Sequence, residues 1–191
     1  MLLKVAKTIR TCTTASIMAT IMLAVIYVTK PQIYGEVRNM IVAFLFLGLF
    51  PILAYPLQKY IPQYKDKGRD GQRNLAMIFS VFGYILGCSI NLFFNAPLEM
   101  WIIYLGYLIS GVCILLINKL FHLRASGHAC GVAGPIMLLI VFGVPALIPG
   151  VVLLIIVWWA SLIMKRHTFT QLVGGTAIPL IAVAILNAIL R

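Results

Sequence analysis

Three short polar clusters interrupt a chain that is otherwise strongly apolar. They read YKDKGRDGQRN (residues 64–74), RASGH (residues 124–128) and KRHTFTQ (residues 165–171). Each lies at a predicted helix boundary, and the second and third open helices, where unpaired backbone N–H groups beside arginines form an anion site. The last two clusters also carry histidines, His128 and His167, which tertiary packing can set across one site. Together these groups predict chemistry on a phosphoryl group.

The residue types fit the separate tasks of phosphoryl transfer. Arginines bind the nonbridging oxygens and stabilise charge in the transition state. One neutral imidazole can attack phosphorus while the other protonates the leaving oxygen. The chain holds only four acidic residues, and Asp66 and Asp70 stand among cations that neutralise them. Its four cysteines form no CxxC pair, so no zinc site is indicated. We therefore expect no metal and no cofactor.

The elements that position these clusters are predicted to be membrane helices. The 191 residues are 62% hydrophobic and 10% charged, with a mean hydropathy of +1.05, whereas soluble domains carry about a quarter charged residues. Seven apolar runs approach the roughly 20 residues that span a bilayer. They cover residues 13–29, 39–57, 75–94, 98–118, 129–146, 149–164 and 168–190. The sequence predicts an all-α transmembrane bundle of six to seven spans, forming one domain over residues 1–191.

Two of the runs leave the span count open. FGVPALIPGVV, between the fifth and sixth runs, holds two prolines and two glycines. Proline ends one helix and starts the next. The two runs are therefore either two spans joined by a tight hairpin or one broken, re-entrant element. The first run has basic residues before it and no cleavage site after it, so we expect a retained first span.

The basic residues are concentrated at one predicted face. Of the 15 lysines and arginines, 12 fall in residues 1–10, 58–74, 119–128 and 165–167, which share a face if there are seven crossings. By the positive-inside rule that face is cytoplasmic, and the expected location is a bacterial or archaeal cytoplasmic membrane. If the seven cations of the clusters that follow Tyr64 bind phosphate instead, the split becomes 5 against 3. We interpret the net charge of +11 as serving to bind anionic lipid headgroups, to set the membrane topology and to bind phosphate. No nucleic-acid partner is expected.

The three clusters resemble the three motifs of the type 2 phosphatidic acid phosphatase superfamily, which includes membrane lipid phosphatases and polyprenyl diphosphate phosphatases. In that family the first motif supplies a lysine and an arginine, usually followed by proline. The second reads proline-serine-glycine-histidine, and the third has arginine, then histidine, then aspartate four residues later. The resemblance covers about residues 59–190, with residues 1–58 as two leading helices. It is strongest at Ser126-Gly127-His128 and at His167.

The resemblance implies roles for the second and third clusters. His128 corresponds to the general acid and His167 to the nucleophile that forms a phosphohistidine. Ser126 and the amide of Gly127 correspond to groups that bind phosphate oxygens. Arg124, in the same cluster, is a further candidate phosphate contact.

In the first cluster the match is less direct. Arg73 is the best match to the family's arginine, and Arg69 stands one helical turn before it. The family's lysine would fall at Asp66, so Lys65 or Lys67 is expected to replace it.

Several positions depart from the family pattern. Asn74 and Ala125 stand where prolines are usual, and Ser161 stands where the third-motif arginine belongs. Lys165 or Arg166 is expected to supply that missing charge.

Gln171 stands where an aspartate orients the nucleophile. Positions 167 and 171 share a helix face, so the Gln171 carbonyl can accept the Nδ1–H of His167 and fix its tautomer. It cannot stabilise an imidazolium as a carboxylate does.

The resemblance implies a metal-independent membrane phosphatase acting on a lipid-linked phosphate. Candidate substrates are phosphatidic acid, phosphatidylglycerol phosphate and polyprenyl mono- or diphosphates. Two alternatives stay open: a catalytically degenerate protein that binds or transports lipid phosphates, and a phosphotransferase. The cluster residues also have ordinary explanations, since His128 can be a polar helix-start residue, His167 part of a topology signal, and Arg69 and Arg73 solvated loop charges. His122 has no family counterpart and is expected at the membrane interface.

Overall fold

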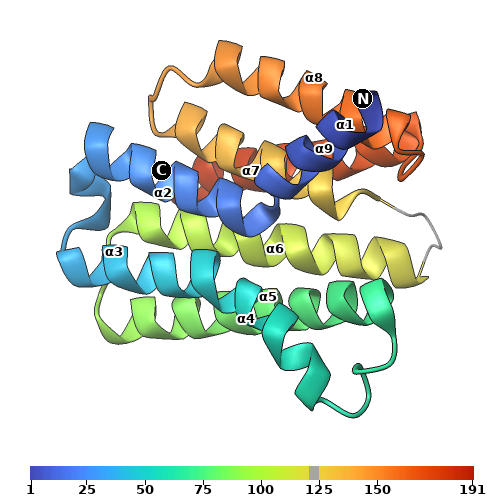
Figure 1. The fold of residues 1–191 in the computed structure, drawn as a ribbon. Coiled ribbons are helices and arrows are strands. Elements are labelled where there is room, and N and C mark those ends of the chain that lie inside the picture. Colours follow the sequence, from blue (N-terminus) through green and yellow to red (C-terminus); the bar gives the residue numbers. More distant parts are fainter. Residues whose placement is uncertain (121–124) are drawn as a thin grey trace.

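The computed structural model describes residues 1–120 and 125–191 (Figure 1). It is 84% helical, and no strand occurs in these two ranges. The predicted all-α class is confirmed. Arg124 and His122 lie outside the described residues.

The chain begins with two helices, α1 (Leu2–Cys12) and α2 (Ala15–Thr29), which are bent by 57° at their junction. The bend falls at Thr13 and Thr14, whose branched side chains favour a helix less than Ala or Leu. Thr13 turns its hydroxyl back to the Ile9 carbonyl at 2.7 Å. The basic segment expected to flank the first span is therefore itself a helix, and it packs against α8 (Leu147–Ile163).

The second apolar run is one long element with an irregular centre. After the short 3₁₀ turn η1 (Pro31–Tyr34) come α3 (Val37–Ala43), the π-helical η2 (Phe44–Leu49), α4 (Phe50–Leu57) and the 3₁₀ turn η3 (Gln58–Tyr60). Pro51 has no N–H for the helical ladder, so a regular α-helix cannot continue through it unchanged. The whole segment Val37–Tyr60 is long and apolar enough to cross a membrane.

The next two helices are regular. α5 (Gly68–Phe93) begins inside the first polar cluster, seven residues before the apolar run expected to form it. α6 (Leu98–Leu120) follows directly and runs back along it (Figure 1). Because α5 starts so early, the first cluster also lies at a helix N-terminus.

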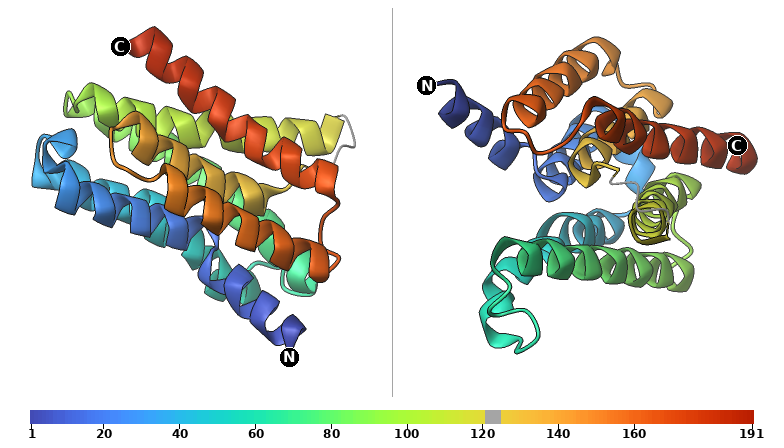
Figure 2. Two further views of the ribbon diagram at one scale, coloured as in Figure 1. Left: turned by 90° about the horizontal axis from the view of Figure 1, so that it is seen from above. Right: turned by 90° about the vertical axis from the view of Figure 1, so that its right-hand side faces the viewer.

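The fifth and sixth runs form two separate helices, α7 (Gly127–Val141) and α8, which are antiparallel neighbours (Figures 1 and 2). Gly143, with φ of +74°, ends α7: its N–H donates to the Ile140 carbonyl, and Val144 N–H donates to the Leu139 carbonyl. This is the Schellman pattern that glycine favours. The last helix is α9 (Phe169–Leu190).

Fewer helices are full-length spans than the six to seven predicted. Four described elements meet the length and composition of a membrane span, and the bent pair α1–α2 is a fifth if it is counted as one. At 15 and 17 residues, α7 and α8 are shorter than the roughly 20 residues that a bilayer core requires. The long apolar helices mark a membrane protein.

α7 lies at the centre of the bundle, with α2, α6, α8 and α9 packed around it (Figure 2). Small residues let these helices approach closely. A Cβ at Gly131 would lie 2.5 Å from the Cβ of Ala15 in α2, and a Cβ at Gly175 in α9 would collide with the backbone of Ser126. This packing brings the starts of α5, α7 and α9 to one end of the bundle, the right-hand end in Figure 1.

Candidate functional site

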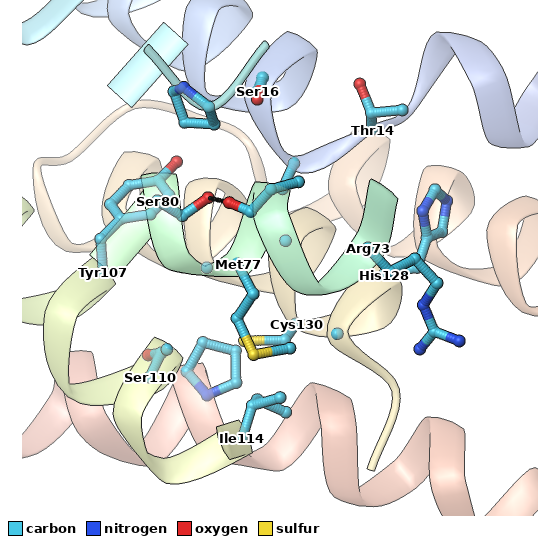
Figure 3. A pocket seen from close by; sticks show the side chains of 18 of the residues that line it. Thr14, Ser16, Arg73, Met77, Ser80, Tyr107, Ser110, Ile114, His128 and Cys130 are labelled. Atoms are coloured by element: carbon cyan, nitrogen blue, oxygen red, sulfur yellow. Dashed lines mark hydrogen bonds between the residues drawn. The ribbon is translucent and has the colours of Figure 1, made fainter. Parts of the chain in front are cut away.

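A cavity of about 610 Å³ lies at that end of the bundle. Its wall includes residues from α1, α2, α4, α5, α6, α7 and α9 and from the segment between α8 and α9. His128 and His167 line it, and so do five cations of the described residues: Lys7, Arg10, Arg69, Arg73 and Arg166. Figure 3 shows Arg73 and His128 at the same end of the cavity. The structure thus brings all three polar clusters to one site.

In the first cluster, Gln58 holds the turn that leads into α5. Its amide nitrogen donates to the carbonyls of Tyr64 at 2.8 Å and Gly68 at 2.9 Å. Gly71 is buried against this amide, and any Cβ there would lie 2.9 Å from it. The turn sets Arg69 and Arg73, one helical turn apart, along the wall of the cavity.

The structure corrects the prediction that Lys65 or Lys67 contacts the phosphate. Lys65 and Lys67 are exposed and do not line the cavity. Lys67 is the N-cap residue of α5, and its ammonium lies 5.5 Å from the centre of the Tyr64 ring. Because α5 begins at Gly68, both lysines remain in the turn before the helix. Asp70 does line the cavity, among the arginines.

In the second cluster, Ser126 is a structural residue and not an exposed phosphate ligand, which is a second correction. It is fully buried, and its hydroxyl accepts the Ala129 N–H at 3.2 Å as the N-cap of α7. Its own N–H donates to the Gln171 carbonyl at 2.9 Å, which ties the start of α7 to α9. The next residue, Gly127, is exposed and lines the cavity.

His128 follows, and its tautomer can be derived from its partner. Its Nε2 lies 3.1 Å from the Thr13 hydroxyl, and that hydroxyl already donates its only hydrogen to the Ile9 carbonyl. The Nε2 of His128 must therefore be the donor. The other ring nitrogen, Nδ1, is left for a ligand.

In the third cluster, a change of backbone direction at the end of α8 places His167 in the wall of the cavity. Lys165 adopts a left-handed conformation with φ of +50°, and the N–H groups of Lys165 and Arg166 donate to the carbonyls of Leu162 and Ser161. This is a second Schellman turn, formed here without glycine. Lys165 is exposed and does not line the cavity, while Arg166 does. Of the two cations expected to supply the missing charge, only Arg166 is therefore placed to do so.

The predicted contact between His167 and Gln171 is confirmed. The Nδ1 of His167 lies 3.2 Å from the amide oxygen of Gln171, and the Thr168 N–H donates to the same oxygen at 3.3 Å. An amide oxygen only accepts, so Nδ1 carries the hydrogen and the lone pair on Nε2 is free. The same pair of residues, Thr168 and Gln171, forms the capping box that starts α9.

Sequence reasoning missed Arg10. Its guanidinium donates to the hydroxyl of Ser161, a fully buried residue whose own hydrogen goes to the Val157 carbonyl at 2.8 Å. A positive charge from α1 is thus held at position 161. No local signal links positions 10 and 161, because only the packing of α1 on α8 joins them.

The cations of the site change the protonation of His167. Partial burial and the positive charges of Arg10, Arg73 and Arg166 lower the pKa of His167, while its hydrogen bond to Gln171 acts in the opposite direction. A lowered pKa keeps the ring neutral near pH 7, the state in which Nε2 is a nucleophile. Within residues 1–120 and 125–191, no group of three His, Cys, Asp or Glu side chains gathers as a metal site would require.

Away from the arginines the cavity becomes largely apolar. Its walls there include Met77 and Val81 of α5, Ile114 of α6, Cys130 of α7 and Val183 of α9, together with Tyr107 and Ser110 of α6. Figure 3 shows Met77, Cys130 and Ile114 together in this part. We call it the apolar arm. A basic mouth joined to an apolar arm matches an amphiphile with an anionic head.

Comparisons of the chain with protein-family models, with curated proteins and with solved structures found no match in any of the three.

Proposed function

We propose that this protein is a membrane phosphatase that hydrolyses a lipid-linked phosphate through a phosphohistidine at His167, without a metal ion or cofactor. The observation that carries the proposal is the convergence of His128, His167 and four arginines, from four separate parts of the chain, on one cavity with an apolar arm. Motif residues in the order of the type 2 phosphatidic acid phosphatase superfamily support the same activity.

In the first step, the free Nε2 of His167 attacks phosphorus and the P–O bond to the lipid breaks. The leaving oxygen takes a proton from Nδ1 of His128, which Thr13 holds through Nε2. Burial and the positive charge of Arg10 lower the pKa of His128 to about 3, so its ring is neutral before the substrate binds. A phosphate dianion bound between the arginines raises that pKa and so favours the protonated form that this step needs. The guanidinium groups bind the nonbridging oxygens, whose charge they stabilise in the transition state.

In the second step, water attacks the phosphohistidine. His128, now neutral, takes a proton from that water as the P–N bond breaks, and His167 returns to its neutral form. Gln171 accepts the Nδ1–H of His167 throughout and so keeps its reactive nitrogen directed away from α9. The products are the lipid alcohol and inorganic phosphate.

The headgroup would lie at the basic end of the bundle and the tail in the apolar arm. Excluding the five cations that line the cavity and the undescribed Arg124, six lysines remain at this end against three cations at the other. This excess supports a cytoplasmic active site. The proposed location remains a bacterial or archaeal cytoplasmic membrane.

The test is phosphate release by purified protein in detergent, with a panel of phosphatidic acid, phosphatidylglycerol phosphate and polyprenyl phosphates. We expect release from at least one of them, lost in His167→Ala and reduced at least a hundredfold in His128→Ala. Lys165→Ala is the matched control, because this exposed neighbour does not line the cavity. Full turnover in His167→Ala would remove the proposed nucleophile.

A second candidate is a lipid-phosphate binding or transport protein that keeps the pocket without turnover. The neutral Gln171, in place of a carboxylate, favours it, because an amide stabilises an imidazolium less well. Such a protein would bind a nonhydrolysable phosphonate lipid and release no phosphate from any member of the panel.

A further inference from the structure

Two buried hydroxyl groups of α6 line the apolar arm. Tyr107 and Ser110 of α6 line the cavity and are only 8% and 5% exposed. Among the described residues, neither hydroxyl has a hydrogen-bond partner. A buried helical serine commonly returns its O–H to the carbonyl four residues earlier, as Ser80 does to Ala76 at 2.8 Å. Buried polar groups are nearly always paired, and these two also line a cavity, so they point to a ligand in the arm.

The two hydroxyls lie on one face of α6, farther from the basic end of the bundle than the phosphate site. Tyr107, Ser110 and Ile114 are spaced as i, i+3 and i+7, so they face the same side. The Cγ2 of Ile114 would lie 4.0 Å from a Cβ at Gly127, the residue before His128. At 1.5 Å rise per residue, Ser110 lies about 6 Å and Tyr107 about 10 Å deeper than Ile114. Figure 3 shows both at the end of the cavity opposite Arg73 and His128.

We propose that Tyr107 and Ser110 form a subsite for the ester carbonyl groups of a glycerolipid phosphate. This inference rests on the proposed function and narrows its substrate to the diacylglycerol phosphate class. Both hydroxyls can donate to a carbonyl oxygen, which is an acceptor only. With the glycerol extended, an ester carbonyl lies on the order of 6 Å from phosphorus, from the ordinary lengths of the bonds between them. With the phosphorus level with Ile114, beside Gly127, that distance reaches Ser110. Tyr107, one helical turn deeper, would then serve the second ester or the far side of the first.

The other candidate lipids do not fit these hydroxyls. A polyprenyl chain is hydrocarbon beyond its phosphate and offers no acceptor, so both hydroxyls would stay buried and unpaired against it. A site built to hydrogen-bond a substrate group rejects an analogue that lacks the group. An ether-linked dialkylglycerol phosphate is the closest analogue, since it keeps the shape and loses only the carbonyls.

The experiment compares three substrates at one chain length: diacylglycerol phosphate, its dialkyl ether analogue and a polyprenyl phosphate. We expect kcat/KM to be about tenfold or more higher for the diacyl lipid, the factor that corresponds to one hydrogen bond to a buried group. In the double variant Tyr107→Phe with Ser110→Ala, the diacyl and ether lipids become equivalent. A small water-soluble phosphate monoester, which does not reach the arm, is hydrolysed equally by both proteins.

Tyr104→Phe is the matched control. Tyr104 is also a buried tyrosine of α6 without a partner for its hydroxyl in the described part of the chain, but it does not line the cavity. Its variant therefore keeps the preference for the ester lipid. Equal rates on ester and ether lipids in the unmodified protein, or a preference that survives in the double variant, would overturn the subsite.

Binding separates this inference from the proposed function. If no lipid is hydrolysed, diacyl and dialkyl phosphonates are compared by the thermal stabilisation they give to the unmodified protein. Greater stabilisation by the diacyl phosphonate, lost in the double variant, supports the subsite even where catalysis fails. Equal stabilisation rejects it.

Discussion

The guanidinium of Arg10 donates a hydrogen bond to Ser161, a residue 151 positions later in the chain. In the proposed resemblance, Ser161 corresponds to the arginine of the third motif. In this chain a buried serine instead binds an arginine from α1. Burial, and then the positive charges of Arg166, Arg73 and Arg69, lower the pKa of Arg10. The first helix is therefore part of the site, although the motif resemblance begins only near residue 59.

Arg10 is expected to be needed for turnover. Replacing it with serine removes a charge from the phosphate-binding group, and loss of one such donor typically costs about 10²–10³-fold in kcat. The measurement is phosphate release under saturating lipid phosphate. Lys4→Ala is the control, because Lys4 is an exposed cation of the same helix that does not line the cavity. Unchanged kcat in Arg10→Ser would exclude a role in catalysis.

Transferring the positive charge from position 10 to position 161 should partly restore activity. In the double variant Arg10→Ser with Ser161→Arg, an arginine again occupies this part of the site. We expect kcat to recover at least tenfold relative to Arg10→Ser alone. Ser161→Arg in the unmodified background places two guanidinium groups together and should reduce activity. No recovery in a folded double variant would show that the charge must come from α1.

The protonation of His167 should respond to two neighbours in opposite directions. Arg166→Gln removes a cation that disfavours the imidazolium, so the pKa of His167 rises. Gln171→Leu removes an acceptor that favours it, so the pKa falls. In the unmodified protein the pKa lies below the ordinary value of 6.5. NMR titration of the histidine ring signals measures all three, and a shift of the same sign in both variants would contradict the arrangement.

Catalysis should depend on the hydrogen-bond acceptor that Gln171 offers to His167, and not on its being an amide. Gln171→Leu frees the ring of His167 to adopt the wrong tautomer, which we expect to lower kcat by about a hundredfold or more. Gln171→Glu keeps an acceptor at the same place, and its carboxylate favours the imidazolium, so kcat should stay within tenfold of the unmodified value or exceed it. Thermal unfolding is followed in parallel, since this side chain also caps α9. Equal losses in both variants would count against tautomer control.

The contact between α9 and the start of α7 should depend on one glycine. A Cβ at Gly175 would meet the backbone of Ser126, which cannot move without disturbing the cap of α7. Gly175→Ala is expected to destabilise the protein by about 1–3 kcal/mol, as overpacking does. In the adjacent Gly174→Ala, the new Cβ would lie 4.0 Å from Ala125, an ordinary contact. Thermal unfolding that treats the two variants alike would contradict this packing.

The sequence alone predicted the helical class, the gathering of three polar clusters and the contact from His167 to Gln171. These follow from composition, from the order of the spans and from a helical spacing of four. It did not predict that Lys65, Lys67 and Lys165 face outward, because their direction depends on where α5 begins and on a left-handed turn without glycine. Nor did it indicate Arg10, Thr13 or the hydroxyls of α6, whose positions depend on contacts between distant helices.

Trapping the phosphoenzyme tests most directly whether His167 is the nucleophile. Purified protein is mixed with lipid phosphate, quenched without acid to preserve phosphohistidine, digested and analysed by mass spectrometry, with His167→Ala and Lys165→Ala in parallel. We predict a phosphoryl group on His167 in the unmodified protein and in Lys165→Ala, and none in His167→Ala. Steady phosphate release with no phosphorylated histidine, or with the phosphoryl group on another residue, would contradict it.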